Sequence, residues 1–219
     1  MEEKFTLTYY SDILCVWAYI SQERVDQVSK RFFDNVSIDY RFCSVFGDTA
    51  YKIGNGWAQK GGYKGFGNHL HEVVSKFDYI NLHPAIWQQN RPTSSIPAHI
   101  VLKAVQRADK SRFTDMLKKL RIDFFGSCLD ISKWAVLEAA LEDVGISVHD
   151  VCELIDSGVA HADLEADHRN QQKLMIKGSP TIILNEGRQK LYGNVGYGVI
   201  EANINELLNS PVAGAASWC

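Results

Sequence analysis

The chain lacks both an excess of positive charge and any long hydrophobic run. Its 219 residues include 23 Lys and Arg against 26 Asp and Glu, for a formal net charge of −3. Nucleic-acid-binding proteins usually carry a basic surface, so we expect no nucleic acid partner. No apolar stretch approaches the roughly 20 residues of a membrane-spanning helix, so we expect no membrane partner.

Cysteine is also scarce, and no cluster of potential metal ligands is visible. The odd number of cysteines and their wide scatter argue against a disulfide framework and favour a reducing compartment. Residues 1–4 run directly into a strand-like pattern without the features of a secretory leader, so we expect a cytoplasmic protein. No Cys, His or carboxylate residues have metal-site spacing, so we expect no metal. The five cysteines are Cys15, Cys43, Cys128, Cys152 and Cys219.

The first part of the chain has the pattern of a β-α-β unit. Residues 5–10 read as a strand, and apolar residues spaced three and four apart predict a helix ending near Phe32. Alternating apolar and polar residues over 36–42 predict a second strand with one buried face. Such a unit is expected to be parallel and right-handed.

The middle of the chain predicts helices, and the last part predicts a hairpin and a final helix. Residues 47–67 are rich in glycine and polar residues and read as a long loop, which amphipathic helices follow. Strand signals return at 181–184 and 190–192 around a turn at 185–187, and a helix follows. We therefore divide this α/β chain into a strand–helix part at 1–46, a helical insertion at 47–163 and a strand–helix part with a tail at 164–219.

One cysteine occupies a position that favours the thiolate form of its side chain. Cys15 lies on the turn between the first strand and the first helix, where the helix dipole and free N–H groups stabilise an anion. We therefore expect a thiol pKa below the usual value. In a C-x-x-C redox motif the second cysteine would occupy position 18, where this chain has Ala18.

Three short motifs resemble those of DsbA-like proteins. They differ from the family pattern at Val16 (usually proline), at Ala18, and at Val195-Gly196, where related proteins often have Asp-Arg. The resemblance implies a thioredoxin fold, β-α-β then β-β-α, interrupted by a large all-helical insertion, with a cis peptide bond before Pro180. The matching segments are Ser11-Asp12-x-x-Cys15-x-Trp17 followed by Tyr19-Ile20, Gly178-Ser179-Pro180-Thr181, and Leu191-Tyr192-Gly193.

The same resemblance implies the residues of the site. Cys15 is the expected catalytic residue, and the active-site loops comprise Val16, Trp17, Ala18, Ser179 and Pro180. Ser179, Thr181 and Asn194 are candidates for binding glutathione. A tail rich in small residues ends in Cys219, which is a candidate resolving thiol.

Three functions are compatible with these residues. The first is a thiol-disulfide oxidoreductase that acts on thiol or disulfide substrates through one cysteine and is linked to glutathione. The second is a glutathione-dependent isomerase or transferase, like 2-hydroxychromene-2-carboxylate isomerase or the kappa-class transferases, although these relatives usually have serine at the position of Cys15. The third is a non-catalytic protein that binds peptides.

Overall fold

A computed structural model describes residues 4–209. Its centre is a four-stranded mixed sheet in the order β2-β1-β3-β4. β1 (Phe5–Ser11) pairs in parallel with β2 (Val36–Phe42) and antiparallel with β3 (Thr181–Leu184), and β3 pairs antiparallel with β4 (Gln189–Tyr192). The predicted strands are therefore confirmed, and β2 forms one edge of the sheet.

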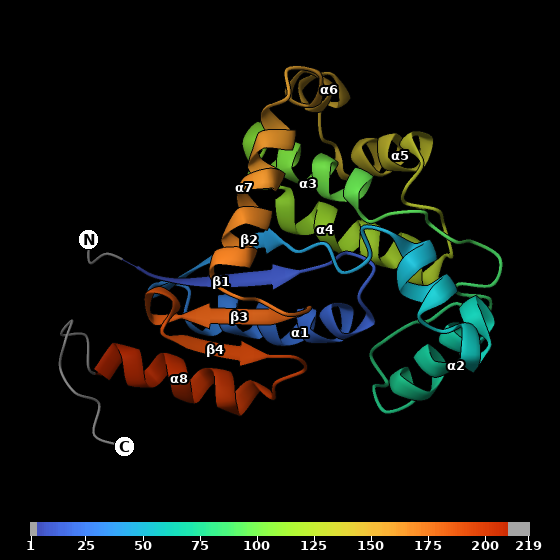
Figure 1. The fold of residues 1–219 in the computed structure, drawn as a ribbon. Coiled ribbons are helices and arrows are strands. Elements are labelled where there is room, and N and C mark those ends of the chain that lie inside the picture. Colours follow the sequence, from blue (N-terminus) through green and yellow to red (C-terminus); the bar gives the residue numbers. More distant parts are fainter. Residues whose placement is uncertain (1–3, 210–219) are drawn as a thin grey trace.

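The order of elements is that of the predicted thioredoxin fold. α1 (Val16–Arg31) connects β1 to β2, and α8 (Tyr197–Asn209) follows the β3–β4 hairpin. α1 and α8 pack against each other on one side of the sheet, and α7 lies across the other side (Figure 1). The thioredoxin fold with inserted helices is thus confirmed.

The insertion consists of several short helices packed above β2 and beyond the end of the sheet (Figure 1). α7 continues this helical stretch back to the sheet, where it contacts α3 and β2. The helices are α2 (Gly62–Val74), α3 (Ile96–Ala108), α4 (Phe113–Arg121), α5 (Trp134–Val144), α6 (Val148–Asp156) and α7 (Val159–Lys173), with helical turns η1 (Ala50–Asn55), η2 (Ala58–Lys60) and η3 (Ile122–Gly126), and a last turn η4 (Asn185–Gly187) lies in the hairpin.

The loop predicted over residues 47–67 is wrong, because this stretch is mostly helical. η1 and η2 occupy its first part, and α2 begins at Gly62. Ile53 and Phe66 are buried in the main core, which anchors the segment. Gly67 does not mark a loop: an added Cβ there would lie 2.5 Å from the carbonyl oxygen of Ile86, so this glycine permits close packing.

Side chains of β1 alternate between the two faces of the sheet, as the pleat requires. Leu7 and Tyr9 pack with apolar residues of α1 and α8. Tyr10 points to the opposite face and packs with Cys43, Ile176 and Ile183. β1 is thus covered on both sides, which fixes the position of the turn that follows it.

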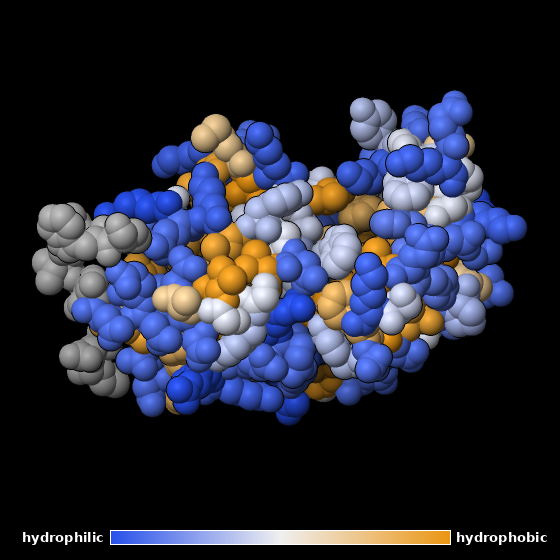
Figure 2. All heavy atoms as spheres, turned by 90° about the horizontal axis from the view of Figure 1, so that it is seen from below, coloured by the Kyte–Doolittle hydropathy of each residue, from blue (hydrophilic) through white to orange (hydrophobic). Residues whose placement is uncertain are grey.

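The face seen from below is mostly hydrophilic, with hydrophobic groups gathered near its middle (Figure 2). Among the described residues, no helix is both long and apolar enough to cross a bilayer.

Candidate active site

Cys15 is the N-cap residue of α1, at the turn that follows β1. Its backbone is extended, and its N–H donates to the carbonyl of Asp12 at 3.1 Å. The thiol is buried, with 6% of the residue exposed, and Sγ donates to the carbonyl oxygen of Ser179 at 3.2 Å. The sequence therefore located this cysteine correctly at the start of the helix.

The loop before β3 lies directly against this turn. The Ser179–Pro180 peptide bond is cis, as predicted. Ser179 contacts the turn twice, because its carbonyl accepts from the Cys15 thiol and its hydroxyl accepts from the N–H of Asp12 at 2.8 Å. Two segments separated by more than 160 residues thus meet at Cys15.

The expectation of a lowered pKa for Cys15 is wrong. Burial raises the pKa of this thiol above its usual value, and the negative charge of Asp12 raises it further. The side chain of Ser179 and the N–H groups of Ala18 and Trp17 lower the pKa by hydrogen bonding to the sulfur, but they do not overcome the rise. The helix terminus favours the thiolate, but removing the sulfur from water costs more.

Asp12 carries a fully buried carboxylate beside this turn. Oδ2 accepts from the N–H groups of Val45 and Phe46 at 2.9 and 2.8 Å and from the Ser95 hydroxyl at 2.9 Å. Oδ1 accepts from the N–H of Leu14 at 3.0 Å. Burial raises the pKa of Asp12 to about 6 in spite of these donors. The carboxylate therefore joins the turn that carries Cys15 to the segment after β2 and to the start of α3.

His99 of α3 completes this buried network. Its Nε2 accepts from the N–H of Ile13 at 3.0 Å and lies 3.8 Å from Oδ1 of Asp12. Burial lowers the pKa of His99 well below its usual value, so the ring is neutral and carries its proton on Nδ1. The ring stacks on Phe42, with centroids 4.6 Å apart. Sequence reasoning missed this histidine, because it lies 84 residues from Cys15 along the chain.

Arg121, at the end of α4, also ties the insertion to the sheet. It is fully buried, and Nη2 donates to the Ser11 hydroxyl at 3.2 Å while Nη1 donates to Oε1 of Gln22. No carboxylate lies within ion-pair distance of it among residues 4–209. An arginine on an amphipathic helix usually faces water, so the sequence could not reveal this contact.

Aromatic residues line α1 next to the thiol. Trp17 is half-buried and meets Phe77 edge to face, with ring centroids 6.4 Å apart. The hydroxyl of Tyr79 donates to the carbonyl of Ile20 at 3.1 Å. Val16 and Ala18 are buried, so of the three residues after Cys15 only Trp17 reaches the surface.

The other candidate residues have varied surroundings. Thr181 is buried and its hydroxyl donates to the carbonyl of Gly178 at 2.8 Å, so this hydroxyl is already engaged. Asn194, shortly before α8, accepts from Arg24 Nη1 and, at 3.5 Å, from the Ser21 hydroxyl. Cys219 lies outside the described residues.

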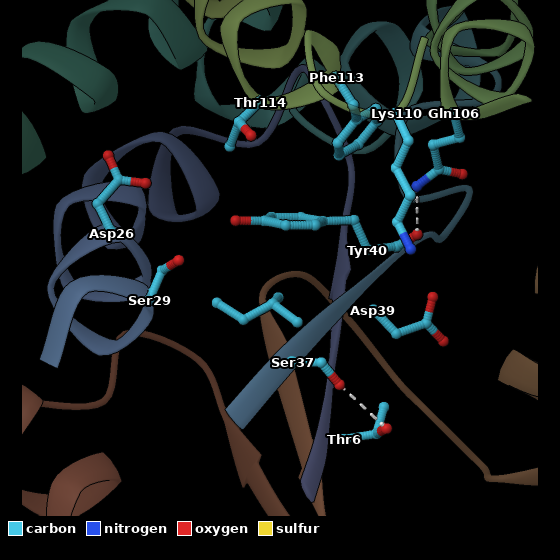
Figure 3. A pocket seen from close by; sticks show the side chains of 11 residues that line it. Thr6, Asp26, Ser29, Ser37, Asp39, Tyr40, Gln106, Lys110, Phe113 and Thr114 are labelled. Atoms are coloured by element: carbon cyan, nitrogen blue, oxygen red, sulfur yellow. Dashed lines mark hydrogen bonds between the residues drawn. The ribbon is translucent and has the colours of Figure 1, made fainter. Parts of the chain in front are cut away.

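A hollow of about 640 Å³ lies elsewhere, along the outer edge of β2. Polar side chains of α1, β2 and α3 line it, and the ring of Tyr40 projects into it (Figure 3). No residue of the Cys15 turn or of the Ser179 loop contributes to its wall. Among residues 4–209 no group of three or more His, Cys, Asp or Glu could hold a metal ion.

Comparisons with known proteins agree with this architecture. A family model described as a DSBA-like thioredoxin domain matches residues 6–205. No curated protein matched the chain.

Solved structures of the same fold are distant in sequence. A putative protein disulfide isomerase from Nitrosomonas europaea is 15% identical with a TM-score of 0.78, covering 95% of this chain and 99% of its own. The cytosolic disulfide reductase DsbM from Pseudomonas aeruginosa, solved with GSH, is 18% identical with a TM-score of 0.68, covering 94% and 98%. A 2-hydroxychromene-2-carboxylate isomerase is 14% identical with a TM-score of 0.68, covering 94% of this chain and 97% of its own. By its family model, this chain belongs to the DsbA-like thioredoxin-domain family.

Proposed function

We propose that this protein is a thiol-disulfide oxidoreductase in which Cys15 is the attacking thiol and glutathione supplies reducing equivalents. The observation that carries the proposal is the contact of Cys15 Sγ with the carbonyl of Ser179, next to the cis bond before Pro180. The only thiol of the C-x-x-A motif thus lies at the start of a helix and against the loop that precedes β3. A disulfide substrate lying along that loop would present its sulfur to Cys15.

The proposed reaction begins when Cys15 loses its proton. The thiolate attacks one sulfur of the substrate disulfide, a mixed disulfide forms on Cys15, and the other substrate sulfur leaves as a thiol. The N–H groups of Trp17 and Ala18 favour the thiolate form. Because position 18 is alanine, the second thiol that releases the mixed disulfide must come from outside the motif.

Glutathione suits this role on several grounds. The chain's wide cysteine spacing favours a reducing compartment, and all four described cysteines are free thiols. A structurally similar protein, 18% identical, has been solved with GSH and bears the name of a cytosolic disulfide reductase. We therefore propose a cytoplasmic location and a glutathione site formed around Ser179, with Asn194 as a further contact.

A glutathione-dependent isomerase or transferase is the second candidate. The lack of a second cysteine in the motif favours it, and so does the structural likeness to an isomerase. In that reaction glutathione itself would provide the reacting thiol, and the Cys15 side chain would only need to donate a hydrogen bond. The two candidates therefore differ in what happens when the sulfur of Cys15 is removed.

The test is turnover of a small glutathione mixed disulfide with glutathione as the reductant. We expect wild-type protein to catalyse this exchange, and we expect Cys15→Ser to lose essentially all of it. The matched control is Cys128→Ala, which alters another buried cysteine far along the chain. Conjugation or isomerisation that survives in Cys15→Ser would favour the second candidate, and no exchange by wild type would favour a peptide-binding protein.

A further inference from the structure

Cys43 is a second buried thiol close to the candidate site. It follows directly after β2, and its N–H donates at 3.1 Å to the carbonyl of Ser11, the last residue of β1. Cys15 lies only four residues beyond Ser11. The Cys43 side chain has no exposed surface. It packs with Tyr10, Ile176 and Ile183 on the face of the sheet opposite α1 and α8.

Ser179 acts on both thiols. Its carbonyl accepts from Cys15 Sγ, and its side chain lowers the pKa of Cys43 against the larger effect of burial. Negative charge on Asp12 or Cys15 raises the pKa of Cys43 further. Asp12 bridges the same segments, because its N–H donates to Ser179 and its carboxylate accepts from Val45.

We propose that Cys43 is the resolving thiol of this site, attacking the Cys15 sulfur once Cys15 carries a mixed disulfide. This inference rests on the proposed function, because it needs Cys15 to be the attacking thiol. It supplies from the end of β2 the sulfur that Ala18 does not provide.

The step balances as a thiol-disulfide exchange. A bond forms between the sulfurs of Cys43 and Cys15, the bond between Cys15 and the substrate sulfur breaks, and the Cys43 proton ends on the leaving thiol. Two glutathione molecules then reduce the Cys15–Cys43 disulfide to two thiols and become glutathione disulfide.

The burial of Cys43 fits this role. Burial raises its pKa well above the usual value, so at rest the thiol stays protonated and does not react with oxidants in solution. A thiol with no exposed surface is out of reach of external substrates, so the disulfide that it attacks has to be one carried by this chain.

The other described cysteines do not share this position. Cys128 follows η3 in the insertion, and its thiol donates to the carbonyl of Ala85 at 3.7 Å. Cys152 lies on α6, in the part of the insertion furthest from the thiol turn. Cys128→Ala is therefore the matched control for Cys43→Ala.

The experiment treats reduced full-length protein with an equimolar amount of glutathione disulfide, quenches with acid and an alkylating agent, and maps the peptides without reduction. In wild type we expect a Cys15–Cys43 disulfide and loss of the glutathione adduct. In Cys43→Ala we expect the adduct on Cys15 to persist. Cys128→Ala should behave as wild type. Cys43→Ser, which keeps a similar volume, serves if Cys43→Ala does not fold.

The outcomes separate the two proposals. A lasting glutathione adduct on Cys15 of wild type, with Cys43 alkylated, would overturn the resolving role while leaving the proposed function intact. A Cys15–Cys219 disulfide would overturn it as well. If Cys15 takes up no glutathione in any variant, the proposed function itself fails.

Discussion

At the scale of single residues, the environment of Cys15 decides how reactive it is. Two opposing effects act on its sulfur: the start of α1 favours the thiolate, whereas burial and the carboxylate of Asp12 favour the thiol. Burial is the larger effect, so the resting thiol is protonated and bonded to Ser179. Reactivity at neutral pH then depends on small changes in the surrounding charge.

Replacing Asp12 with asparagine tests the contribution of this charge. Loss of the negative charge should lower the pKa of Cys15, by up to about one unit. The rate of alkylation of Cys15 by iodoacetamide, followed by peptide mass across a pH series, should rise at lower pH than in wild type. The control is Asp167→Asn, measured at the same temperature, because Asp167 is also a buried acid but does not act on the pKa of Cys15.

An unchanged midpoint in Asp12→Asn would show that Asp12 is only a structural acceptor. A lowered midpoint in both variants would point to a general loosening of the fold.

Restoring a second cysteine at position 18 gives another prediction. Ala18 is on the first turn of α1, and its N–H donates to the carbonyl of Cys15 at 3.0 Å. Ala18→Cys should form a disulfide with Cys15 and reduce insulin disulfides faster than wild type, with a dithiol as the external reductant. Ala18→Ser is the control of similar size, and equal rates for both variants would contradict a role for the sulfur.

At the scale of elements, the insertion is held to the sheet by close packing and buried polar contacts. α2 approaches the backbone near Ile86 through Gly67, and α3 reaches the thiol turn through Ser95 and His99. These contacts explain why a glycine-rich stretch is helical here. They depend on residues distant in sequence, which local propensity cannot detect.

A pair of glycine substitutions tests this packing. Gly67→Ala should destabilise the protein by about 1–3 kcal/mol, because its Cβ would overlap the carbonyl of Ile86. Gly198→Ala on α8 should be neutral or stabilising by up to ~1 kcal/mol, since nothing lies near the added carbon and alanine favours a helix. Urea unfolding measures both, and equal effects at the two sites would contradict the packing described for α2.

At the scale of the whole molecule, the buried pair Asp12 and His99 links stability to pH. The pKa of His99 is lowered in the folded state, so the unfolded chain takes up a proton first as the pH falls below about 6.5, and stability is lost. The pKa of Asp12 is raised to about 6, so the folded state takes up a proton first between about pH 4 and 6, and this opposes the loss.

Replacing His99 with glutamine isolates one side of this balance. Glutamine can still accept from the N–H of Ile13 but does not titrate. The stability gap between wild type and His99→Gln should therefore shrink by up to ~1.4 kcal/mol per pH unit below pH 6.5. Urea unfolding from pH 7.5 to 5 measures the gap, and a constant gap would mean that His99 is not a buried neutral ring.

The sequence predicted the parts of this molecule that depend on local pattern or motif. The strands, the hairpin, the position of Cys15 at the start of α1 and the cis bond before Pro180 are all confirmed. The pKa of Cys15 was predicted wrongly, because its direction depends on burial by residues from the insertion. The roles of four buried residues depend on contacts across the fold, which spacing along the chain does not reveal. These residues are Asp12, His99, Arg121 and Cys43.

The central claim, that Cys15 is the thiol that exchanges with glutathione, is tested most directly by a crystal structure of the Cys43→Ala variant after reaction with glutathione disulfide. This variant cannot pass the mixed disulfide to Cys43. We expect continuous density from Cys15 Sγ into glutathione, with the glutathione backbone lying against Ser179 and Pro180. Glutathione bound elsewhere, or a Cys15 thiol left unmodified in well-ordered density, would contradict the account.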